Sequence, residues 1–401
     1  MAQLTRDGWL VLASKGTRSF GYGFLSVILG LYLDEVGFSP VHVGFILTAT
    51  LVGSALLTGV VISRADRLGR RRMLMVSSGL MALSGIIFAV AQAPWLLLVA
   101  ALTGTISPTS GEVGPFETIE AAILPQTASE KTRNRAFGLY NAVGAAMVAL
   151  GALAAAIPAT LSLLDLLASY RLMFMLYAAL GIATFLAASR LSPKVELARL
   201  PERASFITLT HSRGPVLRLA GLFAVDSFAG GFVVQSLLVY WFSLRFGVGA
   251  EFLGPLFFGV NVMKSISYLL AVRIADRIGL LNTMVFSHLP SNVLLIMIPL
   301  MPSLTAASAV LLARHLLSQM DVPTRASYIV AVVKPEERTS AVGVTTLSRT
   351  LAHAFGPVLA GAAISVARFG FPFFVAGGLK IAYDLALYFS FREHKPPEER
   401  D

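Results

Sequence analysis

Residues 64–72 read Arg-Ala-Asp-Arg-Leu-Gly-Arg-Arg-Arg, and residues 273–279 read Arg-Ile-Ala-Asp-Arg-Ile-Gly. Each of these charged segments directly follows a long apolar block. Each therefore predicts the end of a membrane-spanning helix followed by a tight turn, in which glycine avoids the steric cost of a side chain. Because the core Asp-Arg-x-Gly occurs at 66–69 and again at 276–279, the chain is predicted to contain two similar halves.

Three further matches keep nearly the same spacing between the halves. Phe20-Gly21-Tyr22-Gly23-Phe24 matches Phe228-Ala229-Gly230-Gly231-Phe232, Pro115 and Glu117 match Pro323 and Arg325, and Arg133 and Gly138 match Arg338 and Gly343. Arg18 and Asp226 also occupy matching positions, with opposite charges. Repeated halves are typical of secondary transporters, in which one half rocks against the other around a central site.

The composition predicts an all-α integral membrane protein. Of the 401 residues, 56% are hydrophobic and only 13% are charged, whereas soluble domains carry roughly a quarter charged residues. The apolar blocks are long enough to cross a bilayer, which takes about 20 residues per helix. Twelve spans are expected, near 10–33, 40–63, 73–92, 95–123, 135–158, 170–190, 216–243, 252–273, 281–301, 303–329, 339–366 and 371–391.

The net charge of +10 indicates orientation rather than a nucleic-acid partner, because the basic residues lie in short connections between apolar blocks. With a cytoplasmic N-terminus, the external loops contain only Arg171, Arg245 and Arg368. We therefore expect a multi-pass protein of the cell membrane with both termini in the cytoplasm. The longest polar interruption predicts the domains 1–191 and 215–401, joined by a cytoplasmic linker at 192–214.

Several classes of function are excluded or disfavoured. The chain has no cysteine, which excludes disulfides and thiolate chemistry. It has no phosphate-binding Gly-x-x-x-x-Gly-Lys-Ser/Thr segment, and its six histidines are dispersed. We expect no enzyme activity, metal or cofactor. The expected partners are the lipid bilayer, a small-molecule substrate and protons, and the chain is expected to be a monomer.

The six-plus-six spans, the charged linker and the segment 64–72 resemble the major facilitator superfamily over nearly the whole chain. The first motif departs from the family pattern at its first glycine, where Ile62 stands, and the second has Leu280 and Leu281 in place of basic residues. The resemblance implies two pseudo-symmetric six-helix bundles. It also implies a latch that helps to hold the outward-open state, formed by Asp66, Arg67, Gly69 and Arg70 with Asp276 and Arg277. The alternative is that the basic run only sets the topology.

Carboxylates at membrane depth suggest proton coupling, because an unpaired charge there is costly. The candidates are Glu112, for which the sequence offers no nearby partner, Asp226 and Asp321. Glu117 and Arg325 occupy matching positions and could form a gate between the halves. Alternatively, Glu117 and Glu120 pair with Arg133 or Arg135.

Span 10 is the richest in polar residues. Arg314, Asp321 and Arg325 share one face of a continuous helix. The substrate-binding candidates are Arg314, His315, Gln319, Lys264, Asn261, Arg349 and Tyr240. The Lys380–Asp384 spacing predicts a pair within span 12, and His288 is expected only to pack.

The surplus of cations in the second half favours an anionic solute. We therefore expect a secondary transporter that works by alternating access and performs proton-coupled efflux or exchange of a small organic anion. The alternatives are a multidrug exporter for lipophilic compounds and a lipid flippase.

Overall fold

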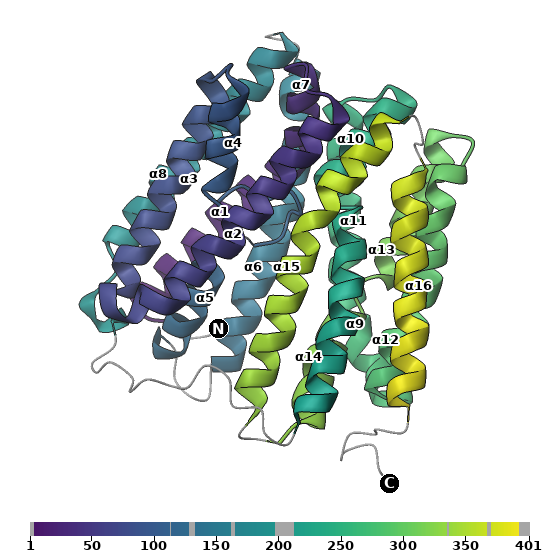
Figure 1. The fold of residues 1–401 in the computed structure, drawn as a ribbon. Coiled ribbons are helices and arrows are strands. Elements are labelled where there is room, and N and C mark those ends of the chain that lie inside the picture. Colours follow the sequence, from purple (N-terminus) through teal and green to yellow (C-terminus); the bar gives the residue numbers. More distant parts are fainter. Residues whose placement is uncertain are drawn as a thin grey trace. The chain divides into compact units, whose positions relative to one another are not determined.

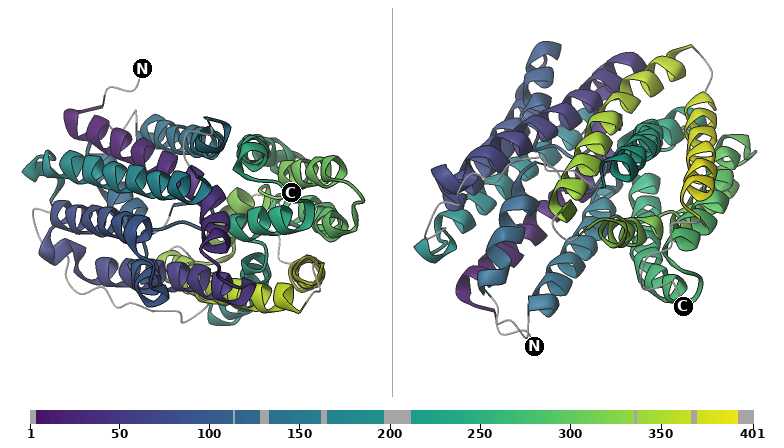
Figure 2. Two further views of the ribbon diagram at one scale, coloured as in Figure 1. Left: turned by 90° about the horizontal axis from the view of Figure 1, so that it is seen from above. Right: turned by 60° about the horizontal axis from the view of Figure 1, so that its bottom comes forward.

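The computed structural model describes residues 4–112, 114–127, 133–161, 165–196, 212–334, 337–366 and 370–392. Within these ranges every regular element is a helix and none is a strand (Figures 1 and 2). All twelve predicted spans are confirmed as helical segments. Eight stretches of the described residues are long and apolar enough to cross a membrane on length and composition alone.

Nine spans are single helices, and three are each divided into two. The single helices are α1 (Arg6–Glu35), α2 (Pro40–Leu68), α3 (Arg70–Val90), α6 (Arg133–Ala154), α8 (Leu166–Ser189), α11 (Ala250–Ile278), α12 (Leu280–Met297), α15 (Arg338–Ser365) and α16 (Phe371–Phe391). The divided spans are α4 (Pro94–Leu102) with α5 (Phe116–Ile123), α9 (Arg213–Gly231) with α10 (Gln235–Phe246), and α13 (Leu304–Leu317) with α14 (Asp321–Val332). The short helices α7 (Ile157–Leu161), η1 (Leu124–Thr127), η3 (Pro193–Val195) and η4 (Ile298–Leu300) complete the described elements.

Side chains at several helix starts satisfy free backbone donors. Thr5 accepts a hydrogen bond from the amide of Gly8 at the start of α1, and Asp165 accepts one from Ala168 at the start of α8. A helix of 30 residues such as α1 extends about 45 Å, which exceeds the hydrocarbon core of a bilayer at about 30 Å. These helices therefore have the length that membrane passage requires.

The prediction of one continuous helix over 95–123 is wrong, because residues 103–112 and 114–115 are not helical. Gly104, Ser110 and Gly114 have positive φ angles of 69°, 64° and 70°, which an α-helix does not accommodate. Buried non-helical backbone needs other hydrogen-bond partners. The hydroxyl of Tyr177 donates to the carbonyl of Thr105, and the hydroxyl of Ser54 accepts from the amide of Gly114 at 2.7 Å.

The described chain forms two compact units. The first unit contains Met1–Glu202 and Gln235–Phe258, and the second contains Arg203–Val234 and Gly259–Asp401. In the first, α3 packs along α8 and α1 along α6; in the second, α9 packs along α15 and α12 along α16 (Figure 1). The domain boundaries expected from the linker stay a prediction.

Glycine allows α1 and α6 to approach closely. A Cβ atom on Gly151 of α6 would overlap the carbonyl oxygen of Phe20 on α1, whereas one on Gly138 of the same helix would meet nothing within 4 Å. We expect Gly151→Ala to lower the melting temperature of the purified protein, because overpacking costs typically about 1–3 kcal/mol.

Gly138→Ala is the matched control for this measurement. It should leave the melting temperature unchanged or raise it, because glycine inside a helix costs about 1 kcal/mol relative to alanine. Equal effects of the two substitutions would contradict the close helix contact.

Candidate functional site

Buried charges gather into one cluster within the first unit. The first cluster consists of Lys15 and Arg18 on α1, Glu112 before α5, Glu120 on α5 and Tyr140 on α6. Arg18 is fully buried, and its terminal nitrogens donate to Glu120 at 2.8 and 2.7 Å. Arg18 also donates to Glu112 at 3.1 and 3.0 Å, and Lys15 donates to the other oxygen of that carboxylate. The hydroxyl of Tyr140 donates to Glu120 at 2.8 Å.

Glu112 has two basic partners, although none lies near it in the sequence. Its partners come from span 1, nearly a hundred residues away in the chain, so sequence spacing could not identify them. Glu120 pairs with Arg18, while the side chain of Arg133 lies outside the described residues. Glu117 is exposed. With two cations against two carboxylates, the first cluster is internally neutral.

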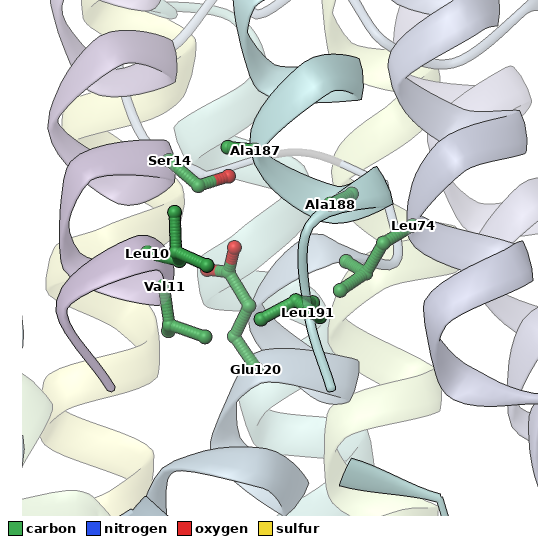
Figure 3. Close-up of a pocket in the computed structure, with 8 residues that line it drawn as sticks. All are labelled: Leu10, Val11, Ser14, Leu74, Glu120, Ala187, Ala188 and Leu191. Atoms are coloured by element: carbon green, nitrogen blue, oxygen red, sulfur yellow. The ribbon is translucent and has the colours of Figure 1, made fainter. Parts of the chain in front are cut away.

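A small cavity lies beside Glu120, between α1, α3, α5 and α8 (Figure 3). Its volume is about 10 Å³, and its lining is otherwise apolar apart from Ser14. Sites for organic ligands usually occupy about 300–1,000 Å³. This cavity is thus too small for an organic solute and has room for one water molecule at most.

The second unit contains a larger charge network. The second cluster consists of Asp226 on α9, His288 and Asn292 on α12, Asp321 and Arg325 on α14, and Lys380 and Asp384 on α16. Lys380 donates to one oxygen of Asp226, and Arg325 donates to the other at 3.2 Å. Arg325 also pairs with Asp321 at 2.9 Å. The second cluster thereby joins four helices.

Two expectations for the second cluster are wrong. Lys380 and Asp384 do not pair with each other, because Lys380 reaches across to Asp226. Asp384 instead lies 2.8 Å from Nδ1 of His288 and accepts a hydrogen bond from Asn292 at 2.8 Å. His288 is not merely a packing residue, and α16 takes part in the charge network.

The two clusters are related through the sequence repeat. Arg18 and Asp226 occupy matching positions, and each is held by opposite charges from the fourth or tenth span. Span 1 is thus paired with span 4 and span 7 with span 10, but the signs of the paired charges are reversed between the two halves.

A group of cations lies along α11 and α13, and we call Asn261, Lys264, Arg314, His315 and Gln319 the cationic group. Arg314 is 7% exposed and bonds Nε2 of His315 at 3.1 Å. Lys264 donates to Asn261 at 3.4 Å, and the charges of Lys264 and Arg314 act on each other. Gln319 contacts the hydroxyls of Ser267 and Tyr268 on α11, at 3.2 and 3.0 Å.

The prediction that Arg314, Asp321 and Arg325 share one continuous helix is wrong, because residues 318–320 interrupt it.

Two other substrate-binding candidates lie outside the cationic group. Arg349 on α15 donates to Ser227 at 3.2 Å, and Tyr240 in the first unit donates to Asp34 at 3.2 Å.

The charged turns adopt the expected backbone. Gly69 and Gly279 have φ angles of 97° and 85°, which favour glycine. The side chains of Asp66 and Arg67 lie outside the described residues, while those of Asp276 and Arg277 are exposed.

One contact at the first turn is not apparent from the sequence. Glu196, at the start of the linker, accepts from the backbone amides of Arg70 and Arg71 at 2.7 and 3.1 Å. It thereby caps α3, where a carboxylate also interacts favourably with the helix dipole. The side chain of Arg70 donates to the carbonyl of Ala122 at 3.2 Å.

Sequence reasoning therefore missed Lys15, Glu196, His288, Lys380 and Asp384 as members of polar networks. Lys15, His288, Lys380 and Asp384 carried one usable signal, which is the rarity of ionisable side chains within membrane spans. Among the described residues, no group of three or more His, Cys, Asp or Glu side chains could hold a metal ion.

Comparisons with known proteins identify a family for this chain and relatives of similar sequence or fold. A sequence model of the Major Facilitator Superfamily matches residues 12–318. An uncharacterized membrane protein of Saccharomyces cerevisiae, YJR124C, is 28% identical over 96% of this chain and 93% of its own. The solved nucleoside transporter NupG superposes with a TM-score of 0.76 at 13% identity, over 97% of this chain and all of its own. The human organic anion transporter MFSD10 gives a TM-score of 0.63 at 17% identity, covering 95% and 99% of the two chains.

The first cluster makes a prediction for stability. Arg18→Gln leaves Glu120 buried without its cation, so we expect a loss of about 3–5 kcal/mol in the free energy of unfolding. The measurement is equilibrium unfolding of the purified protein in detergent.

The double substitution Arg18→Gln with Glu120→Gln restores charge balance, because Lys15 still pairs with Glu112. It should recover part of the loss. Additive losses in the double variant would show that the two side chains do not interact.

Proposed function

Because this chain belongs to the Major Facilitator Superfamily and is a secondary transporter rather than an enzyme, we propose that it carries a small organic anion by alternating access and couples this transport to protons. The direction proposed is efflux or exchange. The residues proposed to bind the substrate are those of the cationic group together with Arg349, and Tyr240 is a separate candidate in the first unit.

Arg314 is the observation that carries the anion proposal. Its guanidinium is buried, its described partner His315 is not an acid, and its Nε has no hydrogen-bond partner among the described residues. A buried cation is costly unless a counter-charge satisfies it. An anionic group bound at Arg314 would supply that charge, and Lys264 would add to the attraction.

Protons are proposed as the coupling ion because carboxylates of both units are buried at membrane depth. The candidates are Glu112, Asp226 and Asp321, each of which contacts a basic side chain in its own unit. Release or capture of such a basic partner would link protonation to helix position. Glu117 in the first unit and Arg325 in the second are each proposed as gating residues, and the turns at Gly69 and Gly279 as latches.

The proposed setting follows the positive-inside distribution of basic residues. The protein is a multi-pass membrane protein, and we place it in the cell membrane as a monomer with both termini in the cytoplasm. The two functional domains proposed are 1–191 and 215–401, with the linker between them.

Ligand-induced stabilisation tests the anion proposal, since a bound ligand raises the melting temperature by mass action. Purified protein is screened against organic carboxylates, phosphate esters and sulfonates, with neutral sugars, nucleosides and lipophilic cations alongside. We expect stabilisation by one or more anions and its loss in Arg314→Ala. Arg273→Ala, which removes an exposed cation from α11, should leave the stabilisation intact.

If lipophilic cations stabilise the wild type and Arg314→Ala equally while no anion does so, the multidrug alternative replaces the anion proposal. Stabilisation by lipids alone would favour a flippase.

Proton coupling is tested in proteoliposomes with the stabilising anion as the transported compound. We expect an imposed pH gradient to drive accumulation of the anion above its equilibrium concentration. The free energy for this accumulation is released by protons that move down their own gradient. A protonophore should abolish the accumulation. Transport that ignores the gradient would disprove proton coupling while leaving the transporter intact.

A further inference from the structure

We propose that His288 and Asp384 together hold the coupling proton of the second unit, and that this proton decides whether Lys380 pairs with Asp226 or with Asp384. This inference rests on the proposed proton coupling and deepens it. It assigns the proton to a pair of side chains on α12 and α16 and identifies the contact that responds to it.

The placement of the imidazole favours its doubly protonated form. His288 is buried, with Nδ1 2.8 Å from Asp384 and Nε2 4.0 Å from Asp226. A neutral imidazole has one N–H donor and one lone pair, so one of its nitrogens would face a carboxylate without a proton. The imidazolium presents a donor to Asp384 and a second positive N–H at ion-pair distance from Asp226.

The ion pairs of the second cluster also favour this proton, although the charges of Arg314 and Arg349 act on Asp226 and Asp321 as well. The contacts link three carboxylates, Asp226, Asp321 and Asp384, to two permanent cations, Arg325 and Lys380. One negative charge therefore remains, and a proton held by His288 and Asp384 neutralises it. Without that proton, a buried carboxylate would keep an uncompensated charge, which is costly.

The other ionisable groups near this site have different contacts. On α13, which packs against α12, Arg314 and His315 bond to each other. On α15, Arg349 donates to Ser227. The ring of Tyr383 lies edge-on to the imidazole, with the ring centres 6.2 Å apart. Among the described residues, His288 is thus the basic side chain that forms an ion pair with Asp384.

Lys380 has two possible acceptors. It donates to the carboxylate of Asp226 and, at 3.3 Å, to the Asp226 carbonyl on α9. Asp384 lies one turn further along α16, at the spacing that favours ion pairs within a helix. When His288 and Asp384 hold the proton, Asp384 is neutralised and Lys380 ties α16 to α9. When the proton leaves to water, the charge on Asp384 attracts Lys380, and this tie weakens.

The pH dependence of stability provides a test that needs no substrate. We expect the melting temperature of the wild type to fall by roughly 2 °C or more between about pH 5 and about pH 9, because proton loss leaves a buried charge. Asp384→Asn should remove this component, since no charge then appears. His353→Gln is the matched control, because the described contact of that ring is with the carbonyl of Ser227, and it should keep the wild-type profile.

His288→Gln separates a proton site from a packing residue. A packing role predicts that this variant lowers the melting temperature equally at every pH, which would overturn the proposal. ¹⁵N NMR of labelled histidine gives a direct readout, with the His288 signal identified by its loss in His288→Gln. An imidazole that does not titrate, or that titrates identically in Asp384→Asn, would also overturn it.

The predicted movement of Lys380 can be measured separately. The natural chain has no cysteine, so spin labels can be attached at Leu217→Cys on α9 and Phe389→Cys on α16, which are both exposed. The distance between the labels should lengthen or broaden as the pH rises, and should not change with pH in Asp384→Asn. A distance independent of pH in the wild type would disprove the switch. Because these measurements use neither an anion nor a pH gradient, their failure is distinguishable from failure of the proposed function.

Discussion

A charge inside a membrane protein must find its counter-charge within the protein, and this constraint organises both units. In water an exposed ion pair contributes little, whereas at membrane depth an unpaired ion costs several kcal/mol. Arg18 meets this requirement through Glu112 and Glu120, and Asp226 meets it through Arg325 and Lys380. Each set of contacts fixes which helices lie side by side. Electrostatic neutrality therefore acts here as a packing rule, in addition to the apolar contacts between the helices.

The spans were predictable because their signal is local. An apolar block of sufficient length, bounded by charge, glycine or proline, predicts a membrane helix whatever its neighbours are. The Asp-Arg-x-Gly turns were predictable for the same reason, since the positive φ angles of Gly69 and Gly279 depend on the backbone of one residue. The break between α4 and α5 was not predicted, although Gly104, Pro108 and Gly114 lie within it, because glycine and proline also occur within continuous membrane helices.

The pairing of charges was much less predictable. Spacing within one helix suggested that Lys380 and Asp384 are partners, yet each finds a better placed partner on another helix. Glu112 has no basic residue near it in the sequence for the same reason, because its two cations lie on α1. A single sequence indicates that a buried charge needs a partner, but only the arrangement of helices identifies that partner. The sequence repeat identified Arg18 and Asp226 as matching positions, but that both pair with the fourth or tenth span is apparent only from the structure.

The non-helical segment between α4 and α5 has a mechanical consequence. A continuous α-helix transmits a push or a twist along its whole length, because each turn is bonded to the next. Residues 103–112 and 114–115 lack that ladder, and side chains such as Tyr177 and Ser54 hold their backbone instead. The fourth span is therefore two short helices with separate anchors. Arg18 holds α5 through Glu120, whereas α4 packs against α2 and α3.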